Sequence, residues 1–189
     1  MLKITAIIPA RGGSKRLKNK NIYPIWGKPM LFWAIQACKN SEFEIDVCVS
    51  SDSEEILQVA RDLGVKTHSR GNETSNDKVY KQAAIRQAAE YLEEKYGKSD
   101  IYISLQANSP TLTSIQLDKG INALLKNNKD EIFSVDSNLM QNAAFRIFKG
   151  DYVFQEDLST NCGVVIAEAH DIHTLDDVEK IENEMIKIC

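Results

Sequence analysis

Apolar, β-rich runs alternate with segments of helical periodicity along the first 135 residues of this 189-residue chain. Strands separated by helices belong to parallel sheets with right-handed crossover connections. The order therefore predicts an α/β fold, with a Rossmann-like, mostly parallel sheet and helices on both of its faces. The predicted strands are 3–8, 45–50, 65–68, 100–105 and 131–135, and the predicted helices are 29–39, 53–63, 77–95 and 114–127.

The alternation weakens after residue 136. Residues 144–148 and 152–154 predict a short hairpin, and 162–167 predict a further strand. A final helix is expected over 174–188, because Thr174 to Asp177 has the outline of a capping box with aspartate at its fourth position. A chain of this length with 43% hydrophobic residues can bury one substantial core. We expect a single domain, 1–189, with a reduced, irregular β segment at about 137–168.

The first predicted strand runs directly into a basic loop that contains glycine. Residues 11–20 carry five Lys and Arg side chains, although the whole chain has a formal charge of −4. Gly12 and Gly13 allow backbone N–H groups to approach an anion, while arginine grips phosphate oxygens as a fork and lysine acts as a mobile point charge. We interpret this segment as a phosphate-binding loop, the alternative being a solvated basic turn. Its spacing matches neither a Walker A element nor a dinucleotide-binding fingerprint.

Polar residues follow four of the predicted strands: Arg11, Asp52, Arg70 and Gln106. Ligands of open α/β sheets bind beyond the carboxyl ends of the strands, so these residues predict one shared site. Two of them have structural alternatives. Asp52 could cap helix 53–63, and Arg70 could form a surface ion pair with Glu73.

Composition narrows the class of partner. An isoelectric point near 5.5 and the lack of a broad basic face argue against nucleic acid. No apolar stretch reaches the length of a membrane span, and the N-terminus lacks the features of a signal peptide, so a cytoplasmic protein without a membrane partner is expected. The four cysteines are singly placed and indicate neither a zinc site nor a disulfide framework. A small anionic ligand is the expected partner.

Several motifs together resemble those of the acylneuraminate cytidylyltransferases, which are CMP-sugar synthetases of the nucleotide-diphospho-sugar transferase type. The likeness is most specific in Pro9-Ala10-Arg11-Gly12-Gly13-Ser14-Lys15, followed by Lys20-Asn21 and Gly27-Lys28-Pro29-Met30-Leu31. Further matches are 49–52, the spacing of Arg70, Glu73 and Asp77, the segment 105–110, Asn161-Cys162-Gly163, and Asp171-Ile172-His173-Thr174.

This resemblance implies attack of an acidic sugar, of the nonulosonic or ketodeoxyoctonic type, on the α-phosphate of CTP with release of pyrophosphate. It implies CTP and the sugar as partners, Mg²⁺ or alternatively Mn²⁺ as cofactor, and a homodimer. The implied catalytic residues are Arg11, Lys20 and Asp171, of which Asp171 also binds the metal. The implied nucleotide-binding residues are Ala10, Arg11, Gly12, Gly13, Ser14, Lys15, Lys20, Asn21, Arg70, Asp77 and Gln106, and the implied substrate-binding residues are Gln106, Ser109 and Asn161.

The chain departs from the family pattern at two informative places. His173 stands where the family has the second aspartate of an Asp-x-Asp element, and only nine residues separate Asn161 from Asp171, where the family has a much longer segment. Two alternatives therefore stay open. One is a catalytically impaired relative that still binds nucleotide, and the other is a cytidylyltransferase for a different small hydroxy acid or phosphonate.

Overall fold

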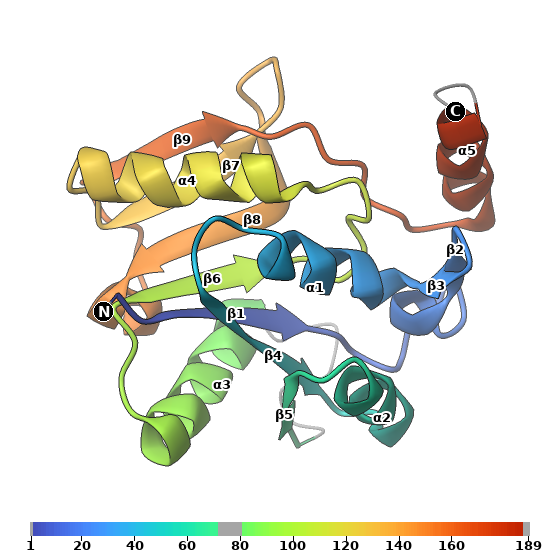
Figure 1. Ribbon diagram of the computed structural model, residues 1–189, viewed down its shortest axis with the longest axis horizontal. Coiled ribbons are helices and arrows are strands. Elements are labelled where there is room, and N and C mark those ends of the chain that lie inside the picture. The colour runs from blue at the N-terminus through green and yellow to red at the C-terminus, as the bar shows by residue number, and fades with distance from the viewer. Residues whose placement is uncertain (1, 72–80, 187–189) are drawn as a thin grey trace.

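The computed structural model describes residues 2–71 and 81–186 (Figure 1). Its main sheet has the strand order β5-β4-β1-β6-β8-β7-β9. Only β8 runs antiparallel to its neighbours in this sheet, so the predicted mostly parallel α/β architecture is confirmed. The strands are β1 (Ile4–Pro9), β4 (Ile45–Ser51), β5 (Lys66–Ser69), β6 (Ile101–Leu105), β7 (Glu131–Val135), β8 (Gln141–Lys149) and β9 (Cys162–Ile166).

Helices cover both faces of the sheet, as predicted. On one face lie α1 (Met30–Lys39), α2 (Glu54–Asp62) and α4 (Ser114–Lys126), and on the other lies α3 (Lys81–Tyr96). A small ribbon of β2 (Pro24–Ile25) and β3 (Lys28–Pro29) precedes α1, and α5 (Leu175–Ile186) packs nearby through Val178 and Ile181. Within the described ranges, we find no helix with the length and apolar character that crossing a membrane requires.

Strand β1 joins the two layers because its side chains alternate between them. Ile4, Ala6 and Ile8 pack with residues of α1, α2 and α4, whereas Ile7 packs with residues of α3. All residues from 4 to 8 are buried, which explains why the strand is a continuous apolar run instead of an alternating pattern.

Three helix starts follow from local sequence. The Ser53 hydroxyl caps α2 by accepting from the Ile56 N–H, so the interpretation of Asp52 as this cap is wrong. Residues 113 and 116 form a capping box at α4. At α5 the Thr174 N–H donates to Asp177 Oδ2 at 2.9 Å and the Asp177 N–H donates to Thr174 Oγ1 at 3.3 Å. The capping box predicted with aspartate is therefore confirmed.

The hairpin predicted over 144–148 and 152–154 is wrong. Residues Gly150–Phe154 form a 3-10 helix, η3, and β8 pairs with β6 and β7 instead. The helical turn places Val153 in the fully buried cluster beneath α3, a position that the short apolar run does not distinguish from a strand. The segment 137–168 contributes both β8 and β9 to the main sheet.

The loop after β1 packs closely against the start of α2. The Gly12 N–H donates to Asp52 Oδ1 at 3.0 Å. A Cβ atom added at Gly12 would lie 2.8 Å from Ser53 Cβ, whereas one added at Gly13 would meet nothing within 4 Å. The first glycine is therefore required by packing and the second is not.

We expect Gly12→Ala to lower the free energy of unfolding by about 1–3 kcal/mol, because the new methyl group must displace the loop or the cap of α2. Gly13→Ala is the matched control and should change it by less than about 0.5 kcal/mol. Urea denaturation of both variants provides the measurement. Equal stability of the two proteins would contradict the packing described for Gly12.

Candidate active site

The basic loop is fixed at both of its ends by hydrogen bonds. Its first residue, Ala10, donates its N–H to the Ser50 carbonyl at 2.9 Å, which continues the β1–β4 pairing. Asn21 is buried in the 3-10 helix η1 (Lys20–Ile22), and its side-chain amide donates to the Arg11 carbonyl at 2.9 Å. Asn21, predicted to contact nucleotide, therefore closes the loop on itself, and the bond from Gly12 to Asp52 attaches the loop to the end of β4.

Arg70 lies at the end of β5 and is only 7% exposed, so its side chain is buried, while the ion pair considered with Glu73 stays a prediction because Glu73 lies outside the described residues. Burial lowers the pKa of its guanidinium; the Asp52 carboxylate opposes this shift and Arg11 adds to it. Its Nε is buried without a hydrogen-bond partner in the part of the chain that the structure describes. Arg70 thus joins Arg11 and Asp52 at this edge, while Glu73 and Asp77 lie outside the described residues.

Asp171 is oriented by the loop that follows β6. Its Oδ2 accepts from Gln106 Nε2 at 3.0 Å and its Oδ1 accepts from the Ser109 hydroxyl. Asn108 and Ile172 exchange two further bonds, one from the Asn108 side-chain amide to the Ile172 carbonyl and one from the Ile172 N–H to the Asn108 carbonyl, both 2.9 Å. Gln106 and Ser109, predicted to bind substrate, hold the predicted catalytic acid in this structure.

The basic loop meets this acidic segment at His173. Arg16 Nη2 lies 3.2 Å and Lys20 Nζ lies 3.4 Å from His173 Nδ1. Burial lowers the pKa of Lys20, and Arg16 lowers it further, whereas Asp171 opposes the change. Burial also lowers the pKa of His173, with Lys20 and Arg16 contributing in the same direction. The imidazole is therefore mainly neutral at pH 7, between two cations and near the carboxylates of Asp171 and Asp177, which oppose the shift.

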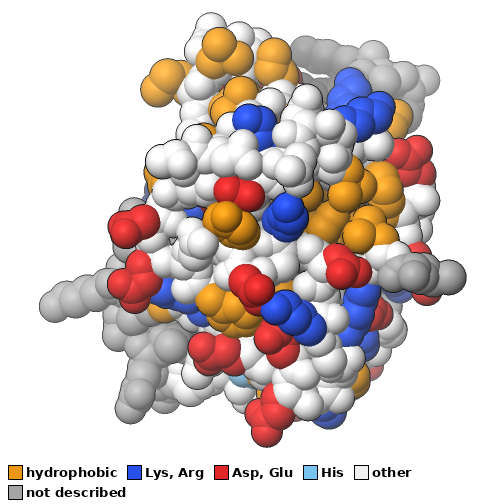
Figure 2. Space-filling view, turned by 90° about the vertical axis from the view of Figure 1, so that its left-hand side faces the viewer, with side chains coloured by type: hydrophobic (Ala, Val, Ile, Leu, Met, Phe, Trp, Pro, Cys, Tyr) orange, Lys and Arg blue, Asp and Glu red, His pale blue; other side chains and the backbone are white. Residues whose placement is uncertain are grey.

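Charges are distributed differently at the other end of the strands. Figure 2 shows the side of the molecule toward which the amino ends of the parallel strands point, and there Lys and Arg side chains are interspersed with Asp and Glu. The cluster of Arg11, Arg16 and Lys20 lies instead beyond the carboxyl end of β1. The basic loop is thus a local feature, suited to a small anion.

Asn161 is not brought to this cluster. It precedes β9, at the strand end opposite to Asp171, where its amide donates to the Asn128 carbonyl at 2.9 Å and its Oδ1 accepts from Lys129 Nζ at 3.1 Å. The remaining predicted residues of the loop, Ser14 and Lys15, stay with Arg11 and Gly12. Lys15 is exposed, and the Ser14 N–H donates to the Gly12 carbonyl at 2.9 Å.

The side chains around Asp171 suit a metal ion that takes most of its ligands from phosphate oxygens and water. Among the described residues no group of three or more His, Cys, Asp or Glu side chains is placed to hold a metal ion. Mg²⁺ is commonly held by one or two carboxylates, with phosphate oxygens and water as its other ligands. Asp171 can supply one carboxylate, but His173 Nδ1 faces two cations and is a poor second ligand.

The contacts of three residues that organise this site do not follow from the sequence. Its pattern predicts Asp52 as a strand-end residue of the shared site or as a cap, Arg16 as one charge of the loop, and His173 as a departure from the family pattern. The contact between Arg16 and His173 joins positions 157 residues apart, so no local pattern could have predicted it. A polar side chain directly after a buried strand was the available signal for Asp52.

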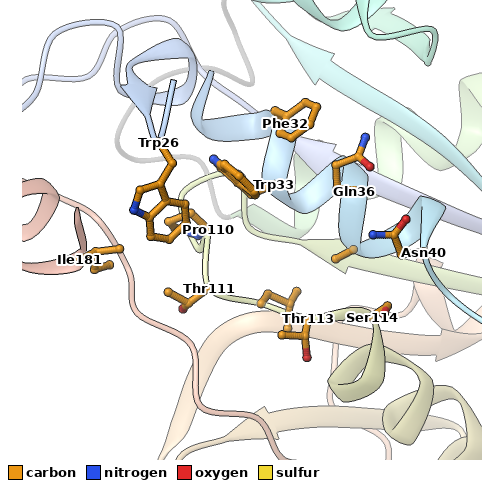
Figure 3. A pocket seen from close by; sticks show the side chains of 12 residues that line it. Trp26, Phe32, Trp33, Gln36, Asn40, Pro110, Thr111, Thr113, Ser114 and Ile181 are labelled. Carbon is orange, nitrogen blue, oxygen red and sulfur yellow. The ribbon is translucent and has the colours of Figure 1, made fainter. Parts of the chain in front are cut away.

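A hollow lies outside this cluster. It has a volume of about 670 Å³ and is lined by residues of the β2–β3 turn, α1, the β6–α4 loop and α5, among them Trp26, Trp33, Pro110 and Ile181 (Figure 3). The two indole rings meet edge to face, with centroids 5.0 Å apart. None of the residues predicted for the phosphate or metal site lines it.

Comparison with known proteins identifies the family. A family model described as cytidylyltransferase matches residues 5–184. N-acylneuraminate cytidylyltransferase A of Danio rerio is 36% identical over 132 residues, which cover 70% of this chain and 30% of that protein. Pseudaminic acid cytidylyltransferase of Campylobacter jejuni is 34% identical over 134 residues, covering 70% of this chain and 58% of that protein. The chain thus matches less than two thirds of the length of these relatives.

Solved structures confirm the fold class. A CMP:2-keto-3-deoxy-manno-octonic acid synthetase complexed with CTP superposes with a TM-score of 0.77 at 17% identity, covering 99% of this chain and 100% of that one. A 4-diphosphocytidyl-2C-methyl-D-erythritol synthase from Anaerococcus prevotii has a TM-score of 0.67 at 14% identity, covering 97% and 98% of the two chains. Together with the family match and the curated relatives, the motifs around the basic loop place this chain in the cytidylyltransferase family.

Proposed function

We propose that this chain is a CTP-dependent cytidylyltransferase that transfers CMP to an acidic sugar of the nonulosonic or ketodeoxyoctonic type. One observation carries the proposal: the basic loop after β1 and the carboxylate of Asp171, far apart in sequence, meet at the carboxyl edge of the sheet. The relatives named for N-acylneuraminate and pseudaminic acid support this class of acceptor.

In the proposed reaction a hydroxyl of the sugar gives up its proton to solvent as its oxygen attacks the α-phosphorus of CTP. The bond from that phosphorus to the oxygen that bridges it to the β-phosphate breaks, and pyrophosphate leaves with the bonding electrons. Arg11 and Lys15 hold the phosphate oxygens, the first as a guanidinium fork and the second as a mobile point charge beside the strand end. Lys20 stabilises the negative charge that develops on the α-phosphate and the leaving group.

The other residues complete the site around the nucleotide. Asp171 would hold Mg²⁺, or alternatively Mn²⁺, with phosphate oxygens and water, and the ion would neutralise phosphate charge as a Lewis acid. Gln106 and Ser109 keep the Asp171 carboxylate oriented. Arg70, whose Nε has no partner among the described residues, would donate to the base or ribose.

A second candidate is a relative that binds CTP without turnover. The observation that favours it is the single carboxylate at the proposed metal position, with His173 where the resemblance expects another acid. A third candidate keeps the chemistry but uses another small hydroxy acid or a phosphonate as acceptor, because the segment before Asp171 is short. Each candidate predicts a different outcome in the assay that follows.

The deciding measurement is pyrophosphate release from each of the four nucleoside triphosphates, with Mg²⁺ or Mn²⁺, across a panel of acidic sugars, hydroxy acids and phosphonates. We expect release with CTP and one acidic sugar. Calorimetry of CTP binding runs in parallel. Binding without release in any combination would favour the catalytically impaired relative, and release only with a hydroxy acid or phosphonate would correct the acceptor class.

Lys20→Ala should reduce turnover by about 3 kcal/mol of transition-state stabilisation, the scale of one lost preorganised donor. Lys18→Ala is the matched control, because Lys18 is an exposed cation of the same loop. Its turnover should stay close to that of the parent protein. Steady-state pyrophosphate release measures both variants, and parental rates for Lys20→Ala would remove Lys20 from the catalytic set.

Asp171→Ala should abolish turnover while changing CTP affinity only slightly, because the carboxylate acts on the reacting phosphate through the ion and contributes little to nucleotide binding. Asp176→Ala removes an exposed acid from the first turn of α5 and serves as the control. Turnover and calorimetric affinity are measured for each. Retained turnover in Asp171→Ala would exclude it from the active site.

A further inference from the structure

The imidazole of His173 makes contacts that the proposed reaction does not use. Arg16 Nη2 lies 3.2 Å and Lys20 Nζ lies 3.4 Å from its Nδ1. Guanidinium and ammonium groups carry only donors, so Nδ1 can bond to them only as an acceptor, with its single lone pair directed at one of them or shared between the two. Nδ1 therefore carries no proton, and the proton of the neutral ring resides on Nε2.

The backbone around His173 is held on both sides. Its N–H donates to Asp177 Oδ2 at 2.9 Å, and this oxygen also accepts from the Thr174 N–H as part of the α5 capping box. The preceding residue, Ile172, exchanges two hydrogen bonds with Asn108. The short, stiff side chain of His173, on a fixed backbone, thus faces the long, flexible side chains of Arg16 and Lys20.

We propose that His173 is a positioning residue whose unprotonated Nδ1 holds Arg16 and Lys20 at the phosphate-binding site. The inference rests on the proposed function, because Lys20 is taken to act on the triphosphate and Arg16 belongs to the same phosphate-binding loop. Without the acceptor, each side chain would have to lose its rotamer freedom when the ligand binds, and the like charges of Arg16 and Lys20 would favour their separation.

A neutral acceptor and a carboxylate differ in their effect on the charge of Arg16 and Lys20. Without a metal ion, a carboxylate at position 173 would form ion pairs with Arg16 and Lys20 and so offset their charge toward phosphate. The imidazole orients the same groups and leaves their charge available. On this interpretation His173 has a function in the site. On the alternative interpretation it only replaces a metal-binding aspartate that has been lost.

Three substitutions separate these interpretations through CTP affinity, measured by calorimetry without divalent metal and without acceptor. His173→Asn offers an amide oxygen near the position of Nδ1 and should bind CTP within about threefold of the parent protein, whereas His173→Leu removes the acceptor and should bind about tenfold more weakly. His173→Asp should also weaken metal-free binding, because it pairs with the cations. The matched control is His170→Asn, the same change at an exposed histidine, which should leave binding unchanged.

Imidazole ¹⁵N NMR of the parent protein provides a readout that does not depend on any variant. The chain has only three histidines, and loss of one signal set in His173→Asn assigns the ring. We expect the Nε2–H tautomer, with an Nδ1 resonance that shifts when CTP draws Arg16 and Lys20 toward its phosphates. A protonated Nδ1 would overturn the inference, as would an Nδ1 resonance that CTP leaves unmoved.

The outcomes for the inference and for the proposed function can be told apart. If the parent protein binds CTP and His173→Leu binds it equally well, the positioning role is overturned and the cytidylyltransferase proposal stands. Tighter metal-free binding by His173→Asp would also overturn the positioning role. If the parent protein binds no CTP and releases no pyrophosphate, the proposed function fails and the inference fails with it. Thermal denaturation confirms that each variant is folded before its affinity is compared.

Discussion

The burial of β1 on both faces is the constraint on which the site depends. Its alternating side chains pack into the α1, α2 and α4 layer on one side and the α3 layer on the other, while parallel ladders to β4 and β6 fix its position in the sheet. Because these strands run in the same direction, the segments that follow them emerge at one edge. Arg11, Asp52 and Gln106 emerge at the same edge for this reason, although 41 and 54 residues separate successive members of the set.

Electrostatic strain at this edge is consistent with a polyanionic ligand. Burial and neighbouring cations lower the pKa values of both Lys20 and Arg70, so each cation is held where its charge is disfavoured. Asp52 and Asp171 offset part of this repulsion, and the neutral ring of His173 orients without adding charge. A bound triphosphate would oppose both shifts, because a nearby negative charge favours the charged form of each cation.

Periodicity and turn chemistry predicted most of the fold, because strands such as β1 and helices such as α2 carry their own burial pattern and end signals. The same approach failed at 150–154, where a short apolar run fits a strand or a 3-10 turn and packing of Val153 decides between them. In the site, the glycine loop and Asp171 were accessible through motifs. The pairing of Arg16 with His173 was not, since side-chain contacts between distant segments depend on the assembled tertiary structure.

The two hydrogen bonds between Asn108 and Ile172 join two segments that lie far apart in the sequence. Together with the bonds from Gln106 and Ser109 to Asp171, they make the end of β6 and the segment before α5 one unit, reinforced by the strand ladder behind it. The basic loop reaches that unit through the side chains of Arg16 and Lys20 on His173. A ligand bound between the basic loop and that unit would therefore touch the cations on one side and the acid on the other.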